Sequence, residues 1–185
     1  MHLASEIRRR RLDFSWFASA CVDQVDRELL LAFREAGCWA ILFGVESGVQ
    51  KNLNAIRKGT TLSQARNAVQ WAKQAGLKVQ ATFLLGIPRE TYAEALRTIE
   101  FACEIAPDVA SFHALAPFPG THLYDHAGEY GTLSEDLADF TYQGAAFVPH
   151  TMTREQIQEL RQRAYRMFYS RPAFLFRRLL GLRRR

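Results

Sequence analysis

The fold class is decided by residues 79–105, which read VQATFLLGIPRETYAEALRTIEFACEI. The first seven residues form an apolar run that predicts a buried strand. Gly86 and Pro88 then predict a turn. Thr91-Tyr-Ala-Glu94 has the spacing of a capping box, and the apolar residues after it recur at helical intervals until Pro107. We therefore expect a strand, a turn and a helix, which is the repeating unit of a parallel sheet.

The same unit repeats along the chain. Apolar runs begin near residues 14, 39, 78 and 109, at steps of 25, 39 and 31 residues. Helical patterns run from Asp26 to Gly37, and from a second capping box at Thr61 to Gly76. This alternation predicts an α/β fold, and the continuous apolar runs predict a parallel sheet that is covered on both faces. Because the chain begins almost directly in a strand, we expect that upstream sequence is missing.

The pattern changes after Leu115. Residues 116–150 are rich in Pro and Gly and predict a long loop. A third capping box at Thr153 opens a helix that ends at Pro172, and residues 173–185 predict a short basic amphipathic helix. We therefore divide the chain into a core at 1–125, an extension with one long helix at 126–170, and a basic tail at 171–185.

Composition and charge exclude several classes of protein. Hydrophobic residues make up 48% of the 185 residues and charged residues 23%, as in an ordinary soluble domain. No stretch approaches the roughly 20 apolar residues of a membrane span. Six arginines and no acid lie in residues 171–185, so the other 170 residues sum to −1 of the net charge of +5. The basic character belongs to the tail and indicates no nucleic-acid partner. Three widely spaced cysteines indicate free thiols in a reducing cytoplasm.

Ligands of parallel α/β folds bind at the carboxyl ends of the strands, which makes three segments candidates. Glu46 follows the second apolar run, where a carboxylate can accept hydrogen bonds from ribose hydroxyls or an ammonium group, or simply cap a helix. The turn at 86–88 lets the backbone approach a flat ligand, or is an ordinary connection. Lys58 could clamp a carboxylate or lie in solvent at a helix end. The residues alone leave these alternatives open.

The histidines and cysteines do not predict a metal site. His113 lies within the fourth apolar run, where a core or lumen position is more common than contact with a ligand. His122 and His126 have a spacing that suits a metal on a helix, but no third ligand is evident. No metal-binding spacing is matched by the three cysteines, which are Cys21, Cys38 and Cys103.

Four motifs occur in order, separated by helices of the expected length: GVESG at 44–48, IRKGTT at 56–61, LLGIPRE at 84–90 and PFPGT at 117–121. Together they resemble the second part of a radical S-adenosylmethionine (radical SAM) domain. The segment ACVDQVD at 20–26 is similar to the subgroup that carries an N-terminal cobalamin-binding domain. The resemblance implies a partial TIM-type (β/α)₆ barrel fragment, in which this chain holds parallel strands three to six, followed by C-terminal helices.

The resemblance also implies which residues bind SAM. A residue after strand four contacts the ribose, a basic residue meets the carboxylate, the turn after strand five lies beside the adenine, and the end of strand six lines the adenine edge. By this resemblance the ribose position is Glu46 with Ser47 and Gly48, and the basic position is Lys58 or Arg57. The turn beside the adenine is Gly86 with Ile87 and Pro88, and the end of strand six is Leu115 with Ala116.

This sequence departs from the family at the iron–sulfur cluster. The family holds a [4Fe–4S] cluster with three cysteines of a CxxxCxxC loop after strand one, and this sequence has no such loop. The resemblance therefore implies SAM and a cluster whose ligands are not in this chain, with cobalamin as a further candidate cofactor of the intact protein. We expect a truncated or split form, inactive alone, that a separate chain carrying the cluster-binding part could complete.

The expected reaction of the intact protein is methyl transfer or cyclisation on a small-molecule substrate. The alternative is a non-catalytic barrel fragment that binds a nucleotide-like ligand or complements a partner. The basic tail at 171–185 also has two interpretations, which are peripheral contact with an anionic membrane and a helix packed on the base of the barrel.

Overall fold

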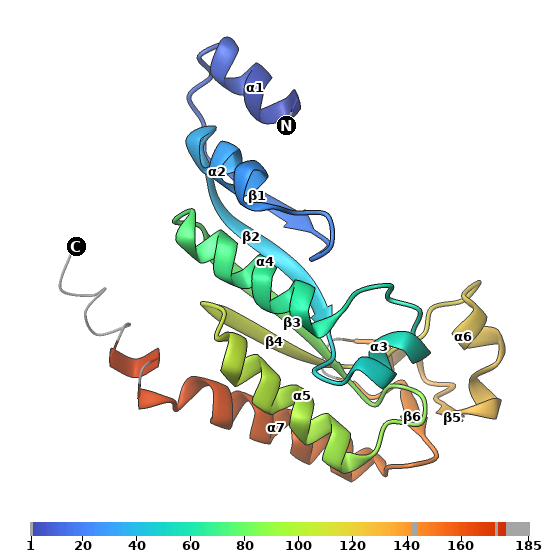
Figure 1. Cartoon of the computed structure of the whole chain (residues 1–185). Helices are drawn as coiled ribbons and strands as arrows, with labels where there is room; N and C mark the ends of the chain where they lie inside the picture. Colours follow the sequence, from blue (N-terminus) through green and yellow to red (C-terminus); the bar gives the residue numbers. More distant parts are fainter. Residues whose placement is uncertain (1, 142–143, 173, 177–185) are drawn as a thin grey trace.

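The computed structural model describes residues 2–141, 144–172 and 174–176 of the chain. Four parallel strands form its centre, in the order β1-β2-β3-β4 (Figure 1). Their bounds are β1 (Trp16–Ala20), β2 (Cys38–Glu46), β3 (Lys78–Leu85) and β4 (Val109–Ala114). Each neighbouring pair in the sheet is also consecutive in sequence, so the predicted parallel α/β fold is confirmed.

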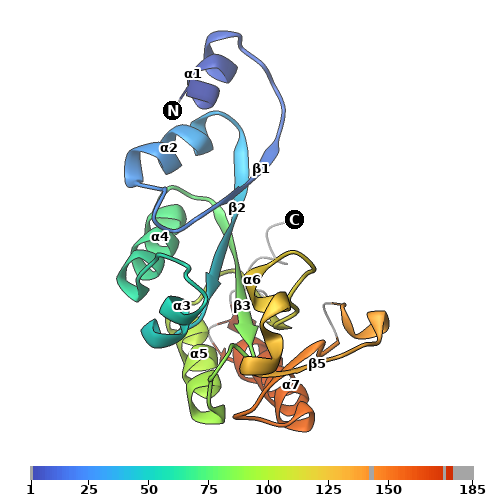
Figure 2. The same cartoon turned by 90° about the vertical axis from the view of Figure 1, so that its right-hand side faces the viewer.

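Among the helices between the strands, those after Asp26, Thr61 and Thr91 begin where the sequence predicts. The helices between the strands are α2 (Arg27–Glu35), α3 (Gln50–Ala55), α4 (Leu62–Gln74) and α5 (Tyr92–Ile105). The side chain of Asp26 caps α2, and capping boxes at Thr61 and Thr91 open α4 and α5. Helices α2, α4 and α5 lie on one face of the sheet, as the view along its edge shows (Figure 2).

The sheet is fully buried on the helix-covered face only. In β3, Val79, Ala81, Phe83 and Leu85 are at most 1% exposed, while the residues between them are partly exposed. The prediction that both faces are covered is therefore wrong for the described residues. It failed because the open face also carries apolar side chains, such as Trp39, which is 51% exposed. Apolar residues on both faces make an alternating strand look continuous in sequence.

A helix precedes the first strand, which corrects the expectation that the chain begins almost directly in a strand. Helix α1 (His2–Arg9) buries Ala4 and Ile7 against Ala36 at the end of α2. Four consecutive arginines at 8–11 obscure its short apolar stripe in the sequence.

Short elements replace the long loop predicted for residues 116–150. They are α6 (His122–Asp125), the 3₁₀ turns η1 (Ala127–Glu129) and η2 (Leu137–Asp139), and an antiparallel pair of strands, β5 (Gly131–Leu133) and β6 (Phe147–Pro149). Each strand has three residues, too few for a period to be seen in the sequence. A Cβ at Gly131 would lie 2.2 Å from the carbonyl oxygen of Val148, so the close approach of these strands requires glycine.

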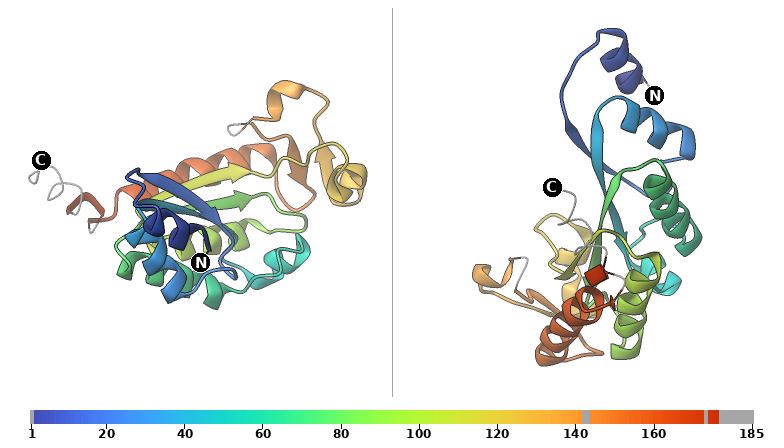
Figure 3. Two further views of the ribbon diagram at one scale, coloured as in Figure 1. Left: turned by 90° about the horizontal axis from the view of Figure 1, so that it is seen from above. Right: turned by 90° about the vertical axis from the view of Figure 1, so that its left-hand side faces the viewer.

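The long helix α7 (Arg154–Tyr169) covers the free edge of β4 (Figure 3). It begins at the predicted capping box of Thr153. The hydroxyl of Tyr169 donates to the carbonyl of Ala110 at 2.9 Å and accepts from its N–H at 3.2 Å. The hydroxyl of Tyr165 accepts from the next outward N–H of β4 at 3.4 Å. These tyrosines satisfy edge groups that would otherwise pair with another strand.

The predicted tail helix lies mostly outside the described residues, which include only Phe174 to Phe176 of residues 173–185. Phe174 packs against the hydrophobic core, and Phe176 is 63% exposed. Both interpretations of the tail stay predictions. None of the helices in the described residues is long and apolar enough to cross a membrane.

Candidate functional site

An ion pair marks the carboxyl end of β2. Nζ of Lys58 donates to Oε1 of Glu46 at 2.9 Å, and the two side chains are 21% and 16% exposed. Glu46 has a φ of +67°, a left-handed conformation that turns the chain sharply at the end of the strand. Gly44 leaves room for the pair, because a Cβ there would lie 2.4 Å from Oε1 of Glu46. The structure therefore brings the predicted ribose residue and the predicted lysine together.

Ser47 and Gly48 serve the turn through packing. Ser47 is fully buried, and its hydroxyl lies 3.0 Å from that of Thr98 in α5. The same threonine hydroxyl accepts from the N–H of Gly48 at 3.1 Å. A Cβ on Gly48 would lie 2.4 Å from Cβ of Phe101, so α5 packs directly on this backbone. These residues hold the turn after β2 against α5 and leave no side chain free for a ligand.

A buried carboxylate organises the turn after β3. Glu90 is fully buried, and its Oε2 accepts from the N–H of Gly86 at 2.7 Å and of Ile87 at 3.2 Å. Gly86 needs its glycine, because its φ is +82° and a Cβ would meet Ile157 at 3.1 Å. Burial raises the pKa of Glu90 to about 7, although hydrogen bonds from Gly86, Ile87 and Asn52 act in the opposite direction.

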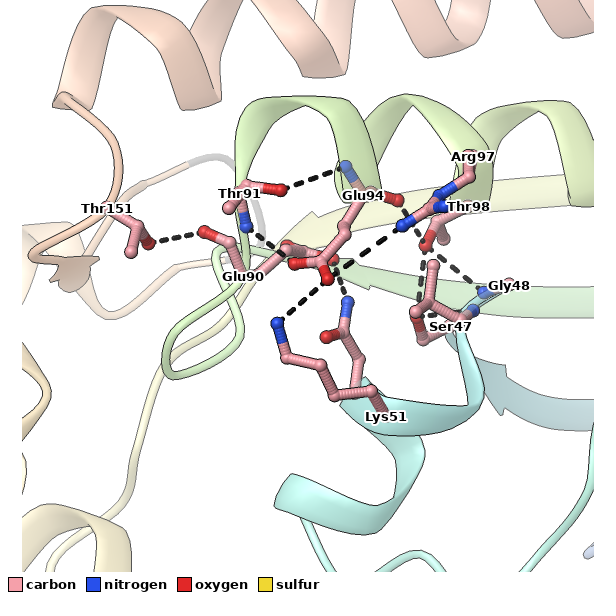
Figure 4. Close-up of polar contacts among 11 residues, drawn as sticks. Ser47, Gly48, Lys51, Glu90, Thr91, Glu94, Arg97, Thr98 and Thr151 are labelled. Carbon is pink, nitrogen blue, oxygen red and sulfur yellow. Dashed lines mark hydrogen bonds and ion pairs between the residues drawn. The ribbon is translucent and has the colours of Figure 1, made fainter.

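Helix α3 connects the two turns (Figure 4). Asn52 of this helix is fully buried, and its Nδ2 donates to Oε1 of Glu90 at 2.8 Å. Next to it, Nζ of Lys51 donates to Oε1 of Glu94 at 2.8 Å. The hydroxyl of Thr151 also donates to the carbonyl of Glu90. Helix α3, which follows the turn after β2, is therefore tied to the turn after β3, although 38 residues separate Asn52 from Glu90 in sequence.

A pocket of about 500 Å³ opens beside this network. Four predicted site residues line it, namely Arg57, Pro88, Leu115 and Ala116. Glu46 and Lys58 are outside its lining, and Ile87 points into the core at 0% exposure. The remaining lining comes mostly from the segment after β4, and its members are Ala55, Ile56, Leu84, Arg89, Pro117, Phe118, Thr121, His122, Leu123 and Tyr130.

The described residues do not fit an iron–sulfur cluster. Among them, no group of three or more His, Cys, Asp or Glu side chains lies close enough to hold a metal ion. The three cysteines are free thiols, and burial raises the pKa of both Cys38 and Cys103, which disfavours the thiolate that a cluster needs. His122 and His126 stack on each other with ring centres 4.2 Å apart and are both exposed.

The family follows from comparison with known domains. The model of the Radical SAM superfamily matches residues 2–102, more than half of the chain. The chain belongs to the radical SAM superfamily. Its four-stranded parallel sheet is thus part of a radical SAM TIM-type barrel, as the motifs at 44–48 and 84–90 predict.

Two relatives in the superfamily match nearly the whole chain. An uncharacterised methyltransferase of Pyrococcus horikoshii is 35% identical over 176 residues, which cover 95% of this chain and 38% of that protein. The anaerobic magnesium-protoporphyrin IX monomethyl ester cyclase of Rubrivivax gelatinosus is 27% identical over 177 residues, which cover 95% of this chain and 32% of that protein. The chain therefore spans about a third of the length of these relatives.

The fold also matches a solved radical SAM methyltransferase, TsrM from Kitasatospora setae. Its structure with tryptophan substrate and a SAM analogue superposes with a TM-score of 0.67 and 17% identity, over 93% of this chain and 40% of that chain. A second structure of TsrM, with cobalamin and a [4Fe–4S] cluster bound, gives a TM-score of 0.61 and 18% identity, over 89% and 34% of the two chains. At this identity the likeness shows the fold alone.

Sequence reasoning missed the residues that hold the site in place. Glu90 lies within the LLGIPRE motif, but its sequence position does not show that the carboxylate folds back onto two backbone N–H groups. Thr98 does carry a signal, because it is a polar residue on the apolar face of α5, beside Ala95 and Ala102. Asn52 carries a similar signal beside Leu53 in α3.

Proposed function

We propose that this chain supplies the SAM-binding half of a radical SAM barrel in an enzyme that transfers a methyl group or closes a ring on a small molecule. The observation that carries the proposal is that α3, which follows the Glu46 turn, is tied through Asn52 to Glu90, whose carboxylate holds the Gly86 turn. It holds two segments of the SAM motifs together at one end of the sheet, in a member of a superfamily named for SAM. The methyltransferase and the cyclase among the relatives support the reaction class.

Each predicted residue has a role that its contacts allow. Oε1 of Glu46 is paired with Lys58, which leaves Oε2 to accept hydrogen bonds from ribose hydroxyls. Nζ of Lys58 keeps further donor capacity for a carboxylate. The N–H of Leu115 already donates to the carbonyl of Leu85 at 2.9 Å, so the backbone of Ala116 is the better partner for the adenine edge. Pro88 supplies an apolar surface beside it.

When bound, SAM would supply the methyl or adenosyl group, and the residues above would orient it. The ligands of the iron–sulfur cluster would lie elsewhere, because the described residues do not fit it. Cobalamin is part of the proposal through TsrM, whose structure contains it. A reducing, cytoplasmic location is supported by three free cysteines.

We also propose that a separate segment or chain supplies the cluster and pairs with β1. The two edges of the sheet differ, since the tyrosines of α7 satisfy the edge of β4. The outer side of β1 pairs with no strand of the described residues. An unpaired parallel edge strand is a template for another strand. The chain would then be a truncated or split form of the enzyme.

Calorimetric titration with SAM and with 5′-deoxyadenosine tests the proposal. Lys58→Met should weaken binding of SAM more than binding of 5′-deoxyadenosine, which lacks the carboxylate. The control is Lys78→Met, since Lys78 is 70% exposed and pairs with Asp108 at the amino end of β3. The assignment of Lys58 to the carboxylate of SAM would be refuted if the chain bound no SAM. It would also be refuted if Lys58→Met and Lys78→Met lost the same SAM affinity.

Iron and sulfide analysis after anaerobic reconstitution separates the two parts of the proposal. The chain alone is expected to retain no stoichiometric cluster. A stable cluster on this chain would overturn the claim that its ligands come from elsewhere. Binding of adenosyl compounds without any rescue by a cluster-bearing partner would favour the alternative of a non-catalytic binding fragment.

A further inference from the structure

Two arginines adopt an unusual backbone conformation at the candidate site. Arg57 has a φ of +52° and Arg89 a φ of +62°, both in the left-handed region that residues other than glycine seldom enter. Both residues line the pocket at the carboxyl end of the sheet. The chain thus places an arginine at two positions where glycine would fit with less strain. Strain of this kind concentrates at functional sites.

The pocket lining holds two charged side chains, and both are arginines. They are Arg57 and Arg89, and the lining contains no Asp or Glu. Among the described residues, neither arginine forms an ion pair. The guanidinium of Arg89 lies 5.4 Å from the ring centre of Tyr130, which positions it without neutralising it. Guanidinium groups in this state suit a carboxylate or a phosphate.

The rest of the pocket suits a flat apolar group. Leu84, Pro88 and Leu115 contribute apolar surface to its wall. Phe118 also lines the pocket and is 64% exposed, so its ring is available for stacking. The volume of about 500 Å³ falls within the range of roughly 300–1,000 Å³ that is usual for small-molecule sites.

We propose that Arg57 and Arg89 form an anion subsite of this pocket, which binds the carboxylate or phosphate of a flat, largely apolar ligand. The ligand of this subsite is either the enzyme's substrate or SAM, and this part of the inference rests on the proposed function. Both sources would present the same chemistry to the arginines. The subsite as such depends only on the charge and shape of the pocket.

The test compares two matched probes, 2-naphthoate and its neutral amide, 2-naphthamide, by equilibrium titration. The wild-type chain should prefer the carboxylate, and Arg57→Gly and Arg89→Gly should each reduce that preference about fivefold. Both substitutions should leave the melting temperature unchanged or raise it, because glycine relieves the strain. The matched control is Arg11→Gly, since Arg11 has a φ of +51° and lies outside this pocket. Equal affinity for the two probes, or a preference that survives R57G/R89G, would overturn the subsite.

A second pair of probes, SAM and the neutral 5′-methylthioadenosine, identifies the source of the anion. If R57G/R89G also loses a preference for SAM, the subsite serves the carboxylate of SAM. If only the naphthoate preference is lost, it serves a substrate. A chain that binds naphthoate but neither adenosyl compound keeps the subsite and refutes the proposed function, so the two failures are distinguishable.

Discussion

Replacing Glu90 with glutamine is expected to change how stability depends on pH. The carboxylate is fully buried and accepts hydrogen bonds from Gly86, Ile87 and Asn52 at 2.7, 3.2 and 2.8 Å. Burial nevertheless raises its pKa from the ordinary value of 4.5 to about 7. The folded protein therefore binds a proton at Glu90 more tightly than the unfolded chain does.

The sign of the effect follows from linkage. Because the pKa of Glu90 is higher in the folded protein, protonation of Glu90 favours the folded state. This contribution to stability is complete below the unfolded pKa of 4.5 and is lost as the pH rises through 7. The difference between 7 and 4.5, at about 1.4 kcal/mol per pKa unit, corresponds to about 3 kcal/mol. E90Q removes the ionisation, and its amide can donate to Oδ1 of Asn52 once the Asn52 amide turns over, since Nδ2 now faces residue 90. Above pH 7 the variant should therefore be more stable than the wild type, by up to about 3 kcal/mol.

Urea unfolding at pH 5, 6, 7 and 8 measures this difference. The gap between E90Q and the wild type should widen with pH and level off above pH 7. Glu104→Gln is the control, because Glu104 is an exposed acid that pairs with Arg66 at 2.6 Å and has a lowered pKa. Parallel stability profiles for E90Q and the wild type would refute the reasoning about the buried carboxylate.

Three further substitutions test the packing around the site. Gly44→Ala should weaken binding of SAM about fivefold in calorimetry, because a Cβ there would displace the ion pair of Lys58. Tyr169→Phe should cost about 1–2 kcal/mol in urea unfolding and speed amide hydrogen exchange at Ala110, whose backbone loses both bonds to the hydroxyl. Gly48→Ala should cost about 1–3 kcal/mol, since its Cβ would overlap α5, and an unchanged melting temperature would contradict that packing.

Local chemistry made the sheet and its helices predictable. Asp26, Thr61, Thr91 and Thr153 each accept a hydrogen bond from a backbone N–H three residues on, as their sequence spacing predicts. The strands were recognised from apolar runs, although β2 extends further than expected, to Glu46. The order of the strands then follows, because consecutive strand–helix units pair side by side.

Long-range contacts made the rest unpredictable. The ion pair of Glu46 depends on Lys58, which is twelve residues further along the chain and follows α3. Glu90 meets Asn52 only because α3 folds back over the turn after β3. Helix α1 and the β5–β6 pair are short, and they are stabilised by contacts with distant segments and not by a sequence period. The motifs therefore indicated where the site lies, while its supporting network became visible only in the structure.

Mapping of amide chemical shifts by NMR during titration with SAM tests the central claim most directly. The claim is that the turns after β2 and β3 and the end of β4 form one SAM-binding surface. It predicts shifts concentrated at residues 44–48, 86–87 and 115–116, with little change in α1 or along α7. No shifts at saturating SAM, or shifts concentrated at α1 or α7, would contradict it.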